Sequence, residues 1–185
     1  MPDSSALRDM LTAYTPADDL EGQYRQRMLE LTHAQGDPFS RNHFNPGHFT
    51  ASAFVLSPDG KDMLLILHGK LGLWLQPGGH VDPDDSDIFA AARREVQEET
   101  AMTALEWPQG TPAIFDVDIH TIPARKNDPD HEHFDVRVLF KATTRDFTAG
   151  DDAKDGRWVP LDEISLEISD ESVMRAVRKI QASQS

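Results

Sequence analysis

The feature that most constrains this chain is one short segment, residues 78–102, which reads GGHVDPDDSDIFAAARREVQEETAM. A double glycine precedes a dense run of carboxylates that contains only two arginines. Like charges this close repel one another unless a cation lies between them. A solvated surface helix usually alternates charges of opposite sign along a face. The segment therefore favours a site for divalent metal over a solvated helix.

The second half of this segment predicts a helix over about residues 87–100. At about 100° per residue, Glu95, Glu98 and Glu99 fall on one face. Arg94 precedes Glu98 by four residues, a spacing that lets the two side chains pair and fixes the orientation of the carboxylate. The pattern predicts a helix that presents three carboxylates together.

The same helix has a predicted start and a predicted buried side. Ser86 or Asp87 can cap it, because a short oxygen side chain accepts a hydrogen bond from an otherwise unpaired backbone N–H. Phe89, Ala92 and Val96 form an apolar stripe on the side away from the glutamates. The helix thus has one side to bury and one side to present.

The double glycine lies at the end of a predicted short strand, residues 74–77. Glycine permits strained backbone dihedrals and close approach to a ligand, so the backbone carbonyl of Gly79 is a candidate metal ligand. Magnesium prefers oxygen ligands, often shared between carboxylates and substrate phosphates. A strand, a glycine loop and an acidic helix would supply such ligands.

The segment resembles the Nudix box, whose pattern is G-x5-E-x7-R-E-U-x-E-E-x-G-U with U an aliphatic residue. The matching residues are Gly79, Arg94, Glu95, Val96, Glu98, Glu99 and Met102. Asp85 stands where the first glutamate is expected, and eight residues rather than seven separate it from Arg94. Ala101 replaces the final glycine, which an alanine can do if the backbone there is not left-handed.

The resemblance implies an α/β fold, a Nudix-like α/β/α sandwich with a mixed β-sheet, here with an N-terminal helical extension. It also implies a hydrolase that cleaves a diphosphate linkage by water attack at phosphorus. The implied substrate is a nucleoside diphosphate derivative: a nucleotide sugar, an ADP-ribose-like compound or a nucleoside triphosphate. The implied cofactor is Mg²⁺, for which Mn²⁺ can substitute.

The resemblance assigns roles to the residues that match the box. Glu95, Glu98 and Glu99 would hold the metal with the Gly79 carbonyl, and Asp85 would lie in an outer shell. Catalytic roles fall to Glu95, Glu98 and Arg94, the last as an orienting residue.

The general base is less sharply defined. Family members draw it from different places, and the alternatives to Glu95 are the acids Glu132 and Asp135. We favour Glu95, because it lies on the metal face of the same rigid helix.

Two other function classes fit the resemblance. An isomerase of the isopentenyl diphosphate type shares the fold but requires a catalytic cysteine, and this chain has none. A nucleotide-sensing module without turnover is the second alternative. Sensors tend to lose the box carboxylates or to carry a DNA-binding domain, whereas the three glutamates are present here.

Composition fits one domain of ordinary size. We expect a helical extension at residues 1–47, a Nudix core at 48–165 and a terminal helix at 166–185. No apolar run reaches the length of a membrane span, and the N-terminus lacks the pattern of a secretory signal, so a cytoplasmic location is expected. A net charge of −14 argues against nonspecific nucleic-acid binding. A small nucleotide-type partner is expected, and a homodimer stays open.

Strand patterns surround the acidic segment. Residues 49–57 and 63–67 predict a hairpin joined by a turn at 58–61. Residues 113–122 and 133–143 each alternate apolar and polar side chains, which predicts two half-buried strands. Residues 158–161 resemble the short strand and turn that commonly follow the core sheet in Nudix proteins. Helices are predicted within 4–33 and at 169–181, and the loop 123–132 separates the two alternating strands.

Basic side chains and histidines supply the candidate substrate contacts. Lys70, Arg41 and Arg137 are candidate phosphate ligands, and Arg137 is favoured because strand parity puts it with His133 and Asp135.

Three histidines, His120, His131 and His133, form a cluster in the alternating strands. Zinc binding, substrate contact and a structural role are its three interpretations, and His120 and His133 are taken as substrate contacts. The carboxylate-rich segment suits Mg²⁺ or Mn²⁺ better than Zn²⁺, so the sequence alone requires no second, softer metal.

Overall fold

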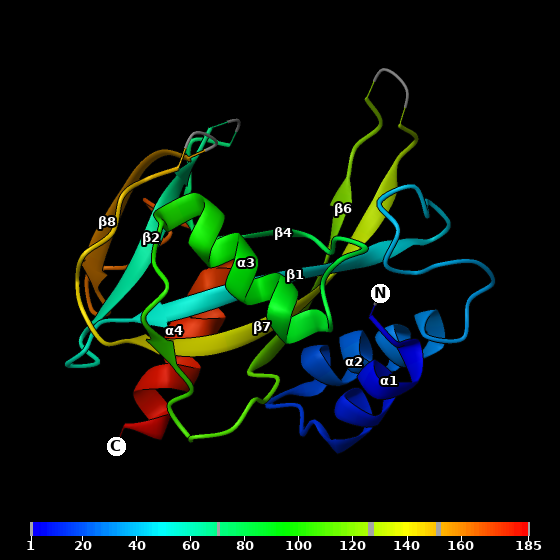
Figure 1. Cartoon of the computed structure of the whole chain (residues 1–185), viewed down its shortest axis with the longest axis horizontal. Helices are drawn as coiled ribbons and strands as arrows, with labels where there is room; N and C mark the ends of the chain where they lie inside the picture. Colours follow the sequence, from blue (N-terminus) through cyan, green and yellow to red (C-terminus); the bar gives the residue numbers. More distant parts are fainter. Residues whose placement is uncertain (1, 70, 126–127, 151–152, 185) are drawn as a thin grey trace. The chain divides into compact units, whose positions relative to one another are not determined.

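The computed structural model describes residues 2–69, 71–125, 128–150 and 153–184, and Figure 1 traces the chain. The chain divides into two compact units. The first unit comprises residues 1–52, 78–92 and 113–138, and the second comprises residues 53–77, 93–112 and 139–185. Three elements run through both units: β1 (Gly47–Leu56), α3 (Ile88–Thr100) and β7 (His131–Ala142).

The remaining elements belong to one unit each. The first unit holds α1 (Ser4–Ala13), α2 (Asp19–Leu31), β4 (Gly78–His80) and β6 (Asp116–Ile122). The second holds β2 (Asp62–His68), β3 (Trp74–Leu75), β5 (Leu105–Glu106), β8 (Ala153–Pro160) and α4 (Glu171–Ser183). None of the helices in the described part of the chain is long and apolar enough to cross a membrane.

The strands are hydrogen-bonded in the order β3-β2-β1-β7-β5. In addition, β4 pairs with β1, β6 with β7 and β8 with β2. The predicted hairpin is present, with Val55 opposite Leu64 in an antiparallel pair. The predicted α/β class with a mixed sheet and N-terminal helices is therefore confirmed.

In the first unit, α1 and α2 pack together and α2 packs against β6. Asp3 and Asp18 cap the two helices, each accepting a hydrogen bond of 2.8 Å from a backbone N–H of the first turn. Figure 1 shows β6 and β7 side by side, and they pair antiparallel from Asp116 opposite Arg137 to Ile122 opposite His131.

The prediction of half-buried strands is wrong for the first half of β6 and the central part of β7. Asp116, Asp118, Asp135 and Arg137 are all buried, although they lie on the polar side of each alternating pattern. These strands are buried on both sides over this stretch, because charged side chains of opposite sign compensate one another there, as described below.

In the second unit, β2 is a central strand. It pairs with β8 through Leu64 opposite Trp158 and with β3 through Ile66 opposite Leu75. Helix α4 begins after Asp170, whose carboxylate accepts a hydrogen bond of 2.9 Å from the N–H of Val173. Its apolar side is buried, which matches the predicted terminal helix.

Candidate functional site

Helix α3 carries the acidic segment, and it starts where the sequence predicts. The Asp87 carboxylate accepts a hydrogen bond of 2.8 Å from the N–H of Ala90, which caps the first turn. Ala92 and Val96 are fully buried. The helix is therefore anchored by one side, and the glutamates extend from another.

Arg94 connects two of the three glutamates. Its Nη1 lies 2.8 Å from Oε1 of Glu95 and 3.1 Å from Oε2 of Glu98. The Glu95 side chain is 12% exposed and that of Glu98 is 58% exposed, so the pair spans from a sheltered position to solvent. Glu99 is half-buried. Arg94 thus fixes two carboxylates by charge-assisted hydrogen bonds.

The end of α3 is held by a backbone segment that the sequence did not reveal, residues 148–150. The N–H of Gly150 donates to the carbonyl of Glu99 at 2.7 Å, and the N–H of Thr148 donates to that of Thr100 at 2.8 Å. A Cβ on Gly150 would lie 2.3 Å from the carbonyl oxygen of Glu98. Glycine is required there, and the contact fixes the turn that carries Glu98 and Glu99.

Ala101 differs from the sequence expectation. Its φ is 55°, in the left-handed region. The box glycine occupies a position that needs this conformation, as helix C-termini commonly do, and the alanine adopts it nonetheless. A side chain there costs roughly 1–2 kcal/mol, so the expectation of an ordinary backbone is wrong.

The double glycine lies in the first unit and forms β4 rather than a strained loop. Gly78 and Gly79 pair with Ser52 and Ala51 of β1, and neither glycine has a positive φ. A Cβ on Gly78 would lie 2.3 Å from Cβ of Ser52. The glycine is therefore needed for close approach to β1.

Asp85, also in the first unit, is 6% exposed. Its Oδ2 accepts a hydrogen bond of 2.8 Å from the N–H of Asp82. This carboxylate closes the turn that connects β4 to α3.

Histidines gather on neighbouring strands of the first unit. His48 of β1 has ring-centroid distances of 5.2 Å to His80, 5.1 Å to His131 and 4.8 Å to His133. His120 lies opposite His133 in the strand register, with ring centroids 5.3 Å apart. The predicted cluster is present, and His48 and His80 extend it.

Burial disfavours the charged form of three of these histidines, His48, His80 and His133. It lowers the pKa of His48 to about 4, despite a hydrogen bond with the His43 carbonyl. Burial is also the main reason why the pKa values of His133 and His80 are lowered, with neighbouring cations and histidines adding to the effect. The three rings are therefore neutral near pH 7.

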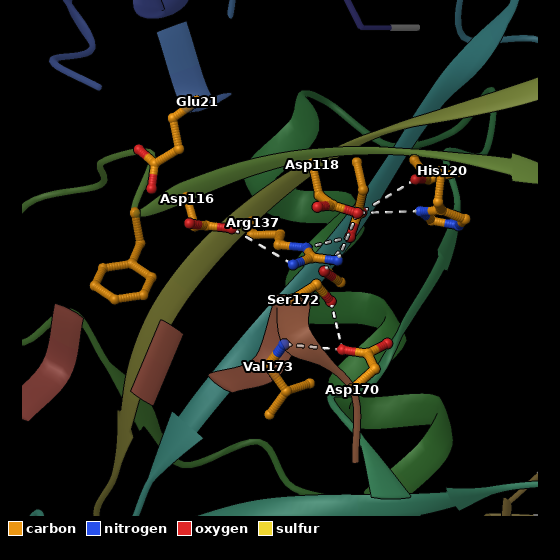
Figure 2. A network of polar contacts seen from close by, with 12 residues as sticks. Glu21, Asp116, Asp118, His120, Arg137, Asp170, Ser172 and Val173 are labelled. Carbon is orange, nitrogen blue, oxygen red and sulfur yellow. Dashed lines mark hydrogen bonds and ion pairs between the residues drawn. The ribbon is translucent and has the colours of Figure 1, made fainter. Parts of the chain in front are cut away.

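Arg137 lies among three aspartates, as Figure 2 shows for Asp116 and Asp118. Its guanidinium nitrogens lie 3.4 Å from Asp116, 3.2 Å from Asp118 and 2.8 Å from Asp135. Burial disfavours its charge, but the three carboxylates more than compensate, so its pKa lies above the ordinary value. Arg137 is 2% exposed, and its predicted contact with phosphate stays a prediction.

Glu132 and Asp135, the two other acids considered as general bases, lie on β7 rather than in a loop, and both are engaged. Asp135 accepts hydrogen bonds from Thr50 at 3.0 Å and from Ser52 at 2.7 Å, in addition to its contact with Arg137. Glu132 forms an ion pair with Arg27.

Among the candidate phosphate ligands, Arg41 is exposed and lines a pocket of about 240 Å³ with His80 and Asp82. Its charge lowers the pKa of His80. Lys70 lies outside the described residues. His120 is exposed, and its Nδ1 lies 3.4 Å from a carboxylate oxygen of Asp118.

Comparison with known proteins gives a family match. The family model described as NUDIX domain matches residues 46–178. A NUDIX-family hydrolase from Clostridium perfringens is 23% identical with a TM-score of 0.53, covering 74% of this chain and 97% of its own. An Ap4A hydrolase from C. elegans has the same identity and TM-score, with coverage of 74% and 98%.

A third structure, from Jonesia denitrificans, is described as a possible asymmetric diadenosine tetraphosphate hydrolase. It is 15% identical with a TM-score of 0.57, covering 72% of this chain and 92% of its own. At these identities the similarity establishes the fold. No curated protein matches the sequence.

Proposed function

The chain belongs to the Nudix family, whose model spans residues 46–178, and on that premise we propose that it is a metal-dependent hydrolase of a diphosphate linkage. The substrate is a nucleoside diphosphate derivative, and water attacks at phosphorus. The observation that carries this proposal is the pairing of Arg94 with Glu95 and Glu98 on α3, next to the half-buried Glu99.

The donor set on α3 fits Mg²⁺. Carboxylate oxygens are the ligands that this hard cation prefers, and it commonly shares them with substrate phosphates. Glu95, Glu98 and Glu99 would hold the metal, and the Gly79 carbonyl is a further candidate. The bound metal would neutralise charge that develops on the phosphoryl group.

The residues of the chain have separate tasks in this proposal. Glu95 accepts the proton of the attacking water, because it is sheltered and held on a rigid helix. Arg94 keeps the carboxylates of Glu95 and Glu98 in place. Arg41, which is exposed beside His80 in the pocket of the first unit, is the candidate that binds phosphate electrostatically. A local cation matters in a chain with a net charge of −14.

The substrate can be narrowed by a direct assay. Two of the similar structures are described as acting on diadenosine tetraphosphate, so Ap4A belongs in a panel with ADP-ribose, nucleotide sugars and nucleoside triphosphates. Phosphorus-containing products are quantified with Mg²⁺ present. Turnover of one class supports a hydrolase, whereas binding without turnover across the panel would favour the sensing module.

Removal of metal should abolish activity. We expect a chelated enzyme to lose essentially all turnover and to recover it with Mg²⁺ or Mn²⁺, because a bound divalent ion offsets the repulsion between a chain of net charge −14 and a diphosphate. The measurement is initial rate against free metal concentration. Full activity in excess chelator would refute the metal-dependent mechanism.

The general base can be identified by three substitutions. At saturating metal, Glu95→Gln should lower kcat by about 10²–10⁴-fold, because a base acts in the chemical step. Its metal affinity should fall as well, because Glu95 is also one of the proposed metal ligands. Glu132→Gln and Asp135→Asn should retain a higher kcat, since neither carboxylate lies on α3 with the proposed metal ligands. Turnover and metal titration of all three variants decide the matter, and near-normal kcat in Glu95→Gln would exclude Glu95 as the base.

A further inference from the structure

The histidines of the first unit offer a second, chemically different binding site. His48, His80 and His133 each provide a ring nitrogen, and these donor atoms all lie within 4.8 Å of one another. The three residues come from β1, β4 and β7. Within the described residues, this is the group of ligand-type side chains whose donor atoms converge in this way, and it contains none of the α3 glutamates.

Strand pairing explains why the three rings meet. His80 lies opposite Thr50 in the β4–β1 pair, so His48, two residues before Thr50, is its diagonal neighbour on the same side. On the other side, β1 approaches β7 so closely that a Cβ on Gly47 would lie 1.8 Å from the carbonyl oxygen of Glu132. His48 follows Gly47 and His133 follows Glu132, so this close approach of β1 to β7 brings the two histidines together.

His48 is prepared to act as a ligand. Its Nδ1 lies 3.1 Å from the carbonyl oxygen of His43, so Nδ1 carries the hydrogen and Nε2 keeps its lone pair. The residue is 1% exposed, and Nε2 is buried with no hydrogen-bond partner. A buried nitrogen of this kind is costly unless something occupies its lone pair. A backbone carbonyl on the opposite nitrogen is the usual outer-shell partner of a metal-bound histidine.

We propose that His48, His80 and His133 bind one transition-metal ion of the Zn²⁺ class, separate from the metal proposed for the α3 carboxylates. Neutral imidazoles suit Zn²⁺, and a hard cation such as Mg²⁺ prefers oxygen. Tetrahedral Zn–N bonds of about 2.1 Å place the nitrogens about 3.4 Å apart. Side-chain rotations that move the ring nitrogens by about an ångström would complete the site. A bound ion links β4, which carries Gly79, to β1 and β7.

The test is Zn²⁺ binding by the whole chain after chelation, measured by calorimetry in excess Mg²⁺ so that the α3 carboxylates are already occupied. We expect about one equivalent of Zn²⁺ per chain. His80→Gln and His133→Gln, which are half-buried and less disruptive than changes at His48, should each weaken binding by more than the 10–100-fold that loss of an outer-shell partner causes.

Two control variants distinguish this site from Zn²⁺ binding elsewhere on the chain. His33→Gln changes an exposed histidine of the same unit, and Glu98→Gln changes the acidic helix; both should bind Zn²⁺ like the wild type. Co²⁺ substitution gives an independent signal, since tetrahedral nitrogen coordination produces visible absorption that the His80 and His133 variants should lack. The proposal would be overturned if the wild type did not bind Zn²⁺ stoichiometrically. It would also be overturned if the folded His80→Gln and His133→Gln variants bound Zn²⁺ as tightly as the wild type.

Discussion

Glu98→Gln and Glu99→Gln should each lower kcat by roughly two or more orders of magnitude, the scale of losing an electrostatic stabiliser of the transition state. Each substitution keeps the size of the side chain and removes a ligand charge from the presented side of α3, without making a cavity. The melting temperature in metal-free buffer should therefore match that of the wild type. Steady-state kinetics and thermal unfolding, measured side by side, test this expectation.

Glu163→Gln is the matched control, because Glu163 is an exposed glutamate of the same unit outside α3. It should leave both kcat and melting temperature unchanged. If Glu98→Gln and Glu99→Gln retain activity within a few fold of the control, the metal-site assignment is wrong.

Arg137→Met should have the largest effect on stability. The substitution removes the cation that lies between Asp116, Asp118 and Asp135 and leaves their carboxylates buried. Breaking a buried ion pair in this way costs about 3–5 kcal/mol, which is a large share of the stability of a typical domain. Urea unfolding at pH 7 measures the loss.

Arg178→Met provides the comparison, since Arg178 pairs with Glu171 at the surface of α4 with both side chains more than half exposed. An exposed pair contributes at most about 1 kcal/mol. The cost of Arg137→Met should also shrink as the pH falls, because protonation relieves the uncompensated aspartates. A small or pH-independent cost would show that packing, not charge, explains the burial of Arg137.

Helix α3 was predictable because its signals are local. The spacing of the three glutamates, the apolar stripe, of which Ala92 and Val96 are buried and Phe89 is half-buried, and the Asp87 cap all lie within about four turns of one helix. The antiparallel hairpin and the α/β class follow from similarly short-range patterns. Each of these features depends on neighbours in the sequence, so the structure retains them.

Features that depend on distant parts of the chain were less visible. His48 joins the histidine cluster because β1 lies next to β7, and His80 joins it because β4 pairs with β1. Gly150 reaches α3 from a loop about fifty residues away. Sequence signals existed for both: a histidine directly after the double glycine, and a glycine in an acidic loop. Neither signal specifies a partner.

Two local expectations failed because the energetic cost of a backbone conformation or of a buried charge depends on the surrounding structure. Ala101 takes a left-handed backbone that alanine disfavours, at the end of a helix that residues 148–150 hold in place. Arg137 was placed on the correct side of its strand with Asp135, but alternation cannot tell that a charged side is buried. The three aspartates that make this burial tolerable come from two strands.

The most direct test of the central claim is hydrolysis of the best panel substrate in H₂¹⁸O, with the products analysed by mass spectrometry. Water attack at phosphorus, dependent on Mg²⁺ and on Glu98, predicts that one ¹⁸O enters a phosphate product of the wild-type enzyme. Glu98→Gln should form that labelled product at least about a hundredfold more slowly. Label found on a carbon-bound oxygen instead of phosphate, or labelled phosphate formed at the wild-type rate by Glu98→Gln, would contradict the mechanism.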